Sequence, residues 1–327
     1  MRENAVHLCG VIADLPTVII NDDGDAVRAD MIIQVLRRSK YEFEQVGEVH
    51  MDCPVIRTKN SELINYIRDN CTKGDLVIIK GAISSRNVKK ASICPHCNEK
   101  NKKVGLLTYI TPIDIINING FTRDYLQKHN IKLDDMELKG PAIYQVLKKV
   151  KEVSNQAYIL GSLANEPDFY SNETEGTKIT QYLLTVHRKF KIKEDEETKD
   201  QDFMWCKTYG SQAEQDYQSL HKGSLVLVNG AIQTRQFTRT NQCEYCGEEY
   251  EWKESVVELV PYSIEYVEDC NILVTKEQLE AYYDKSNFNF DGIRSNDNDD
   301  EDDDDDFEFD NFVLWEVNKN EEKREFT

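Results

Sequence analysis

The chain carries one sequence pattern twice, and this internal repeat constrains its fold more than any other feature. Segment 73–86, with Gly-Asp-Leu-Val-Ile-Ile-Lys-Gly-Ala-Ile at its centre, matches segment 222–235, with Gly-Ser-Leu-Val-Leu-Val-Asn-Gly-Ala-Ile. Other pairs follow the same order: Gly10 with Gly161, 31–40 with 182–191, Cys53 with Cys206, and Cys94–Cys97 with Cys243–Cys246. A length of 327 residues has room for two domains. We therefore predict homologous domains at 1–118 and 157–272, a linker at 119–156 and a tail at 273–327.

Each repeat has the pattern of a small β-barrel. In the second repeat, alternating apolar runs predict strands near 157–164, 178–191, 202–210, 224–239 and 252–267. Segment 211–220 has helical spacing and ends before Lys222-Gly223. Three strands, a helix and two strands is the order of the OB fold, a five-stranded Greek-key barrel. We therefore predict a mainly β protein with two tandem OB folds; another small β-barrel is the alternative.

Apolar residues also recur at helical spacing in the linker. They follow Gly140-Pro141, and proline suits the first turn of a helix. The stripe consists of Ile143, Val146, Leu147, Val150 and Val153. We predict a linker helix whose apolar face packs between the domains.

The negative charge of the chain is concentrated at one end. The formal net charge is −20, and the segment from Asp291 onward carries −12 of it, with sixteen acidic and four basic residues. Its low-complexity acidic run cannot bury enough apolar surface to fold. We predict a disordered acidic tail behind a body that is only mildly acidic, so a polyanion partner is not excluded.

One face of the second repeat combines aromatic and basic side chains. Period-two alternation separates Phe203, Trp205, Lys207 and Tyr209 from the buried residues between them. The neighbouring strands add four more residues to this face: Arg235, Phe237, His187 and Lys189. Bases of a single strand stack on aromatic rings while Lys and Arg bind its phosphates. We predict a single-stranded nucleic-acid site here; the alternative is that these rings cover the core or face the other repeat.

The first repeat has fewer aromatic residues in the matching segment. The alignment places Asp52, Pro54 and Ile56 where the second repeat has Trp205, Lys207 and Tyr209. Its candidate DNA-binding residues are mainly basic: Lys80, Arg86, Arg38 and a basic loop with Lys89, Lys90, Lys100, Lys102 and Lys103. Two aromatic residues, Tyr41 and Phe43, lie in the loop after the second strand. We therefore predict unequal roles, with stacking by the second domain and electrostatic binding by the first.

The second repeat resembles the bacterial single-stranded DNA-binding protein family. The resemblance rests on Gly-Ser-Leu-Ala-Asn-Glu-Pro from Gly161, on Phe-Met-Trp-Cys-Lys-Thr-Tyr from Phe203, and on Lys-Gly-Ser from Lys222 through Thr-Arg-Gln-Phe at Phe237. It is weak in the first repeat. It implies that Phe203 or Trp205, Tyr209 and Phe237 stack on bases. Because the family usually assembles four OB domains, two per chain imply a homodimer.

The resemblance extends to the tail, which in this family recruits replication and repair proteins. The residues that would do so here are Phe307, Phe309, Phe312 and Trp315. Further residues follow to Thr327, which departs from the family's terminal aromatic tip. We expect the tail to compete with DNA for the basic groove as well as to bind partners.

The Cys-x-x-Cys pairs are a second departure from the family. This spacing places two thiolates on one turn, enough for half of a tetrahedral zinc site. Our hypothesis is one structural four-cysteine zinc site formed by Cys94, Cys97, Cys243 and Cys246. The alternatives are a separate site in each domain using Cys53 or Cys206, or a redox pair.

Sequence signatures of enzymes are absent: there is no phosphate loop, no His-Glu-x-x-His helix and no Gly-x-Ser-x-Gly elbow. We predict a non-enzymatic protein that coats single-stranded DNA in replication, recombination, repair or transfer, largely without sequence preference. The alternatives are an OB-fold protein–protein adaptor and an RNA-binding protein. Without a signal sequence or a membrane span, we expect a cytoplasmic, DNA-associated protein, of phage or mobile-element origin.

Overall fold

The computed structural model describes residues 3–36, 51–118, 147, 154–187 except 173 and 175, and 201–271. Met1–Leu273 form one compact unit and Val274–Thr327 a second. Several predicted functional residues lie outside the described residues: Arg38, Tyr41, Lys189, Phe307, Phe309, Phe312 and Trp315. Of the predicted linker helix only Leu147 is described, and it is helical and buried against Cys9, Val11, Leu36 and Leu76.

The first repeat is a closed β-barrel. Its elements are β1 (Asn4–Ile12), β2 (Thr17–Ile20), β3 (Ala26–Leu36), β4 (Met51–Asp52), β5 (Val55–Thr58), α1 (Ser61–Asn70), β6 (Leu76–Ile93) and β7 (Lys100–Ile118). Strand β1 pairs with β3 and β6, β3 pairs with β5, β5 runs parallel to β7, and β7 pairs with β6. This closed circuit, with one helix between the third and fourth barrel strands, is the OB fold.

The second repeat has the same circuit. Its elements are β8 (Asn155–Leu163), β9 (Asp168–Asn172), β10 (Thr177–His187), β11 (Gln201–Tyr209), α4 (Ser211–Ser219), β12 (Leu225–Gln242) and β13 (Glu249–Glu268). Strand β8 pairs with β10 and β12, β10 with β11, β11 runs parallel to β13, and β13 pairs with β12. The predicted mainly β, OB-type fold is therefore confirmed.

Alternation of side chains builds the core of each barrel. Along β10, Thr180, Tyr182, Leu184 and Val186 are buried, and the residues between them are half-buried. Successive side chains of a strand point to opposite faces, so one face fills the barrel and the other remains available to ligands. The sequence pattern could identify this second face for the same reason.

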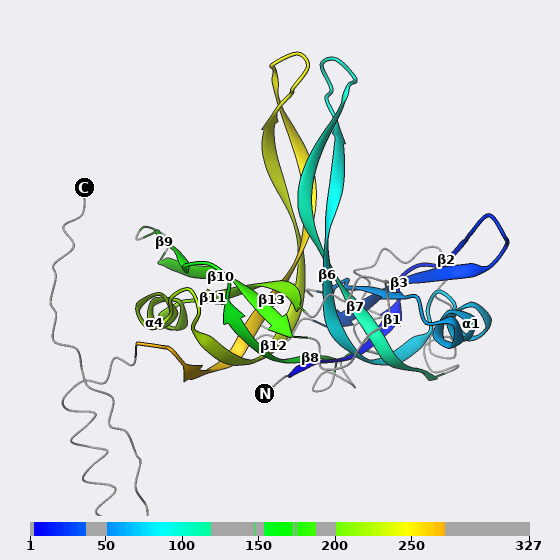
Figure 1. The fold of residues 1–327 in the computed structure, drawn as a ribbon, viewed down its shortest axis with the longest axis horizontal. Helices are drawn as coiled ribbons and strands as arrows, with labels where there is room; N and C mark the ends of the chain where they lie inside the picture. Colours follow the sequence, from blue (N-terminus) through cyan, green and yellow to red (C-terminus); the bar gives the residue numbers. More distant parts are fainter. Residues whose placement is uncertain are drawn as a thin grey trace, which may run out of the picture. The chain divides into compact units, whose positions relative to one another are not determined.

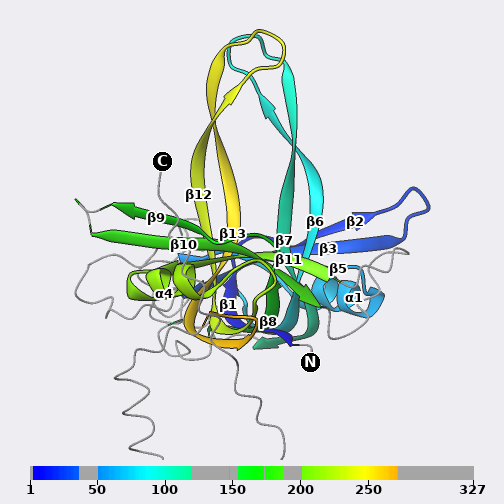
Figure 2. The same ribbon diagram turned by 60° about the vertical axis from the view of Figure 1, so that its left-hand side comes forward.

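The two barrels are joined edge to edge, as Figures 1 and 2 show. Strand β1 pairs antiparallel with β8, from Asn4 opposite Ile159 to Leu8 opposite Asn155. Two buried carboxylates add matching hydrogen bonds between the barrels. An Asp52 oxygen accepts from the Thr234 backbone N–H at 2.7 Å, and an Asp202 oxygen accepts from the Ser85 backbone N–H at 2.7 Å.

These reciprocal bonds correct the predicted alignment of the repeats. Asp52 occupies the position of Asp202, and Ile56 pairs with Ile110 as Cys206 pairs with Leu259. Cys53 therefore corresponds to Phe203, and the alignment of Cys53 with Cys206 was wrong. Asp52, Pro54 and Ile56 are buried, so they do not form the outer face as predicted. The residues at the positions of Trp205, Lys207 and Tyr209 are Val55, Arg57 and Lys59.

The last two strands of each barrel continue past it as a long antiparallel hairpin. We call the hairpin of β6 and β7 arm 1 and the hairpin of β12 and β13 arm 2. Ladder pairing runs to Ile93–Lys100 in arm 1 and to Gln242–Glu249 in arm 2. The arms rise side by side, and their tips meet (Figure 2).

Candidate nucleic-acid interface

The outer face of β11 carries the predicted aromatic and basic row. Met204, Cys206 and Thr208 are buried in the barrel, so the intervening residues point outward. Phe203 and Trp205 are half-buried, and Tyr209 is 45% exposed. Lys207 lies on this face but is only 9% exposed, with Nζ 5.5 Å from the centroid of the Tyr209 ring. The row is open to a ligand at its aromatic positions.

The row extends onto β10 and β9. His187 is exposed at the end of β10, beyond Thr185, which pairs with Phe203. At the other end, Tyr209 pairs with Ile179, which pairs with Tyr170 of β9. Tyr170 is 58% exposed. It was missed in the sequence because strand β9, which contains it, was not predicted.

Arm 2 carries the two other predicted residues of this domain. The Arg235 guanidinium carbon lies 5.4 Å from the centroid of the Phe237 ring, and that of Arg239 lies 4.9 Å from it. Arg235 also makes two hydrogen bonds to the buried Glu258 carboxylate, at 2.7 and 2.8 Å. The strong hydrogen bonds to Glu258 raise the pKa of Arg235, and burial lowers the pKa of Lys207. Arg235 is thus held beside the ring as a fixed cation.

The first barrel presents a different outer face. Arg57 stacks over Tyr109, 5.1 Å from the ring centroid, and makes two hydrogen bonds to Asp30 at 2.7 and 2.8 Å. Lys59 is half-buried on the same face, and Tyr109 is only 6% exposed. This face therefore offers cations and no exposed ring among its described residues.

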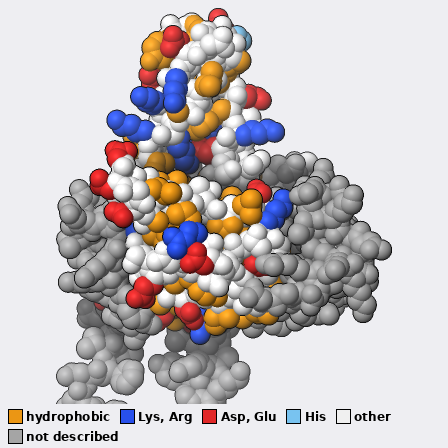
Figure 3. All heavy atoms as spheres, turned by 90° about the vertical axis from the view of Figure 1, so that its right-hand side faces the viewer, with side chains coloured by type: hydrophobic (Ala, Val, Ile, Leu, Met, Phe, Trp, Pro, Cys, Tyr) orange, Lys and Arg blue, Asp and Glu red, His pale blue; other side chains and the backbone are white. Residues whose placement is uncertain are grey.

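Four other predicted residues are on strand β6. Lys80 lies opposite His7 of β1 and Asp114 of β7, where the barrels join, and is not beside the β11 row. Arg86 and Lys90 point toward arm 2, whereas Lys89 is exposed on the outer side of arm 1. Figure 3 shows Lys and Arg side chains along the arm above the barrel.

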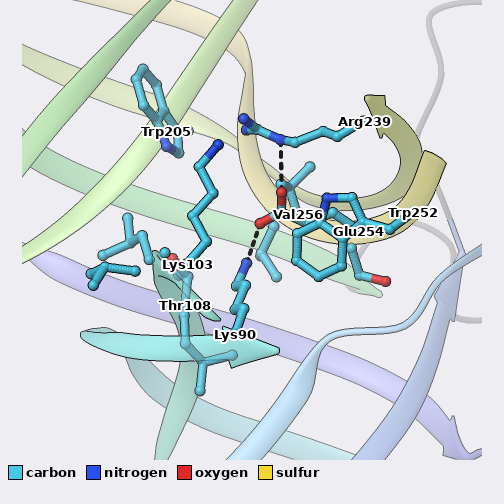
Figure 4. A pocket seen from close by; sticks show the side chains of 14 residues that line it. Lys90, Lys103, Thr108, Trp205, Arg239, Trp252, Glu254 and Val256 are labelled. Atoms are coloured by element: carbon cyan, nitrogen blue, oxygen red, sulfur yellow. Dashed lines mark hydrogen bonds and ion pairs between the residues drawn. The ribbon is translucent and has the colours of Figure 1, made fainter. Parts of the chain in front are cut away.

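A cavity of about 260 Å³ lies between the arms. Three cations and one carboxylate reach it: Lys90, Lys103, Arg239 and Glu254. Glu254 binds Lys90 at 2.5 Å and Arg239 at 2.7 Å. Trp205 of β11 and Trp252 of arm 2 complete the wall, as Figure 4 shows. The sequence singled out Trp205, Lys90 and Lys103, but not Arg239 or Trp252, because only the approach of the arms brings these residues together.

The four predicted metal-ligating cysteines meet at the arm tips. The sulfur atoms of Cys94, Cys97, Cys243 and Cys246 all lie within 4.8 Å of one another. Sγ of Cys94 is 3.7 Å from that of Cys246, and Sγ of Cys97 is 3.6 Å from that of Cys243. Four thiolates at Zn–S bonds of about 2.3 Å would be roughly 3.8 Å apart in a tetrahedron. The donor set and its spacing therefore fit a zinc ion.

Both tips are folded in the same way. The Asn98 N–H donates to the Cys94 carbonyl, and the Gly247 N–H donates to the Cys243 carbonyl. Asn98 and Gly247 both have positive φ, at 59° and 75°, which glycine and asparagine tolerate best. Burial alone would raise the pKa of Cys243, but hydrogen bonds from the Cys246 backbone N–H and the Asn101 side chain lower it to about 6.

Comparisons with known proteins agree with this geometry. A family model, the single-strand binding protein family, matches residues 154–252. Single-stranded DNA-binding protein 2 of Clostridium acetobutylicum is 32% identical over 124 residues, covering 35% of this chain and 91% of that protein. Single-stranded DNA-binding protein 3 of the same organism is 31% identical over 105 residues, covering 31% and 71%.

Among solved structures, the wild-type single-stranded DNA binding protein from Thermus aquaticus aligns with a TM-score of 0.49 and 14% identity, over 85% of this chain and 100% of that chain. Among the described residues, no helix is both long and apolar enough to cross a membrane.

The fold and the Clostridium relatives lead to one assignment. This chain belongs to the single-strand binding protein family.

Proposed function

We propose that this protein binds single-stranded DNA without sequence preference and without catalysing a reaction. The observation that carries the proposal is the open aromatic row of β11, from Phe203 to Tyr209, on the outer face of the second barrel. OB folds bind oligonucleotides on the face of their second and third strands, here β10 and β11, and on the neighbouring loops. The names of the Clostridium relatives support the same polymer.

Stacking and charge divide between the domains in this proposal. Rings at Trp205, Tyr209 and Tyr170 would each hold a base, at about 1–3 kcal/mol per base. The first barrel and the outer side of arm 1, with Lys89, would hold phosphates. Binding of this kind weakens as salt rises. The Lys and Arg side chains of the protein release counterions from the DNA, and this release is less favourable at high salt.

The deciding experiment compares three polymers. Filter binding of the full chain to single-stranded DNA, duplex DNA and single-stranded RNA of equal length should give the tightest binding to single-stranded DNA. Changing Trp205→Ala together with Phe237→Ala should weaken it, whereas Tyr158→Ala, an exposed aromatic at the barrel junction, should not. Tighter binding to RNA than to DNA would favour the RNA-binding alternative. No binding to any of the three polymers would favour the adaptor alternative.

We also propose that the arm tips hold one zinc ion through Cys94, Cys97, Cys243 and Cys246. The bound ion would cross-link the two arms and would have no catalytic role. The 3.6 and 3.7 Å sulfur–sulfur distances support a single shared site over separate sites in each domain. Metal analysis should find one zinc per chain, lost in a Cys243→Ser variant. Full-length protein without zinc, and with unchanged stability after Cys243→Ser, would contradict the site.

The remaining proposals concern assembly and partners. Two OB domains per chain favour a homodimer with four such domains. Residues Phe307, Phe309, Phe312 and Trp315 remain the candidates for recruiting replication, recombination or repair proteins. Sedimentation of the full chain and pull-down with a chain that ends at residue 290 test these two points separately.

A further inference from the structure

The cavity between the arms has the chemistry of a nucleotide pocket. Its charged side chains carry a net charge of +2, from three cations and the Glu254 carboxylate. Because Lys90 and Arg239 share Glu254, Lys103 is the cation that has no carboxylate partner among the described residues. In Figure 4 its side chain points toward the space between Trp205 and Arg239.

The two indoles of the cavity provide the apolar part of the pocket. Trp205 comes from the β11 row and Trp252 from arm 2, and both are half-buried. The Trp252 Nε1–H is buried and has no hydrogen-bond acceptor among the described residues.

We propose that this cavity binds one nucleotide of the single strand, with its base against the Trp205 and Trp252 rings and its phosphate at Lys103. The inference rests on the proposed function and adds a subsite that neither barrel forms alone. The cavity volume is about 260 Å³, so we assign it one nucleotide only. Trp205 belongs both to the aromatic row of β11 and to the cavity wall. A strand that follows the β11 row can therefore place its next base in the cavity.

The wall of the cavity comes from both arms, which distinguishes it from the β11 row. Lys90 and Lys103 belong to arm 1, and Arg239, Trp252 and Glu254 belong to arm 2. The Ser92 hydroxyl and the Tyr250 hydroxyl, 2.6 Å apart, connect the arms between the cavity and the cysteine tips. The width of the pocket therefore depends on the spacing of the arms.

The test uses the fluorescence of Trp252 as a local probe. The chain has three tryptophans, and Trp205→Phe with Trp315→Phe leaves Trp252 alone. The probe ligand is an oligodeoxythymidine of about 30 nucleotides, because each OB fold covers about 4–16 nucleotides. We expect saturating oligonucleotide to quench Trp252 emission by at least about twofold, as expected for a ring that stacks on a base.

Two neighbouring lysines give a matched control. Both lysines are exposed, but Lys103 lines the cavity, whereas Lys102, the residue before it on β7, does not. Lys103→Gln should abolish most of the quenching at saturation, whereas Lys102→Gln should leave it unchanged. Filter binding of the same proteins reports binding to the rest of the molecule.

Three results would overturn the proposal. Oligonucleotide binding that leaves Trp252 emission unchanged would refute the subsite while the proposed function stands. Equal quenching in the two lysine variants would show that the phosphate does not bind at Lys103. Emission that responds to deletion of residues 291–327, and not to oligonucleotide, would assign the cavity to the acidic segment of the chain. Absence of binding in the filter assay would instead be a failure of the proposed function.

Discussion

The two barrels share one circuit of strands and differ in what their outer faces present. The second barrel exposes Tyr209 and Tyr170 and leaves Trp205 half open. At the matching positions the first barrel has Val55, Arg57 and Lys59, and its Tyr109 is covered by Arg57. The shared core shows that the repeat preserves the fold, while the outward positions are free to differ. A duplicated barrel can thereby assign stacking to one copy and charge to the other.

The largest expected effect is that of removing the proposed zinc site, to which each repeat contributes two cysteines. Replacing Cys97 and Cys243 by serine should abolish zinc binding and lower the melting temperature, because a structural metal contributes directly to folding free energy. Metal analysis and differential scanning calorimetry measure both. The control is Cys9→Ser, since Cys9 is buried far from the tips in the cluster that contains Leu147. Equal zinc content in the double variant and the wild type would contradict the shared site.

Removing rings should affect the second barrel far more than the first. Trp205→Ala with Tyr209→Ala removes two stacking positions, at about 1–3 kcal/mol each, so DNA affinity should fall by roughly a hundredfold. The matched change Val55→Ala in the first barrel should alter affinity less than about twofold. Fluorescence anisotropy with a labelled oligodeoxythymidine measures both. Similar losses for the two variants would show that the barrels do not differ as described.

The two buried carboxylates test whether the barrels contribute equally to the stability of their junction. Asp202→Ala and Asp52→Ala each leave a backbone N–H without its acceptor, and each should cost about 1–3 kcal/mol of unfolding free energy. Urea denaturation should give similar values for the two variants, because the bonds are reciprocal. A cost confined to one aspartate would mean that the junction is not symmetric.

Removing a positive charge should affect DNA binding through the first barrel, whereas removing rings affects the second. Lys59→Gln is expected to reduce the slope of log affinity against log salt by about 1, with little change at high salt. The measurement is a salt titration of oligonucleotide binding. Its counterpart, Tyr209→Phe, keeps the ring and should leave the slope unchanged. A slope that does not respond to Lys59→Gln would remove this face from the binding path.

The smallest expected effect is that of the tail. A chain that ends at residue 290 loses a segment of net charge −12. Its affinity for single-stranded DNA should rise a few-fold at low salt and approach that of the full chain at high salt, because screening weakens the competition. Unchanged affinity at low salt would contradict an autoinhibitory tail.

The fold and the arm tips were predictable because they depend on patterns that repeat along the chain. Alternation identified the β11 face, and the position of the helix identified the OB circuit. The cysteine tips were predictable because the Cys-x-x-Cys spacing occurs once in each repeat, and each pair supplies half of a tetrahedral site.

The parts that could not be predicted depend on contacts between the barrels. Asp52 was aligned with the outward-facing Trp205, yet it is fully buried and bonded to Thr234 of the other barrel. The predicted alignment was shifted by three residues, so it exchanged the two faces of segment 52–59 and hid Arg57 and Lys59. Trp252 and Arg239 were missed for a related reason, since only the approach of the arms brings them next to Trp205 and Lys90.

The most direct test of the division between the barrels is ultraviolet cross-linking of bound oligodeoxythymidine, followed by peptide mapping. Ultraviolet light forms covalent cross-links where rings lie against bases. We expect them on the peptide that contains Phe203, Trp205 and Tyr209, and none on the peptide from Val55 to Lys59. Cross-links concentrated on the first barrel, with the β11 peptide unmodified, would contradict the account.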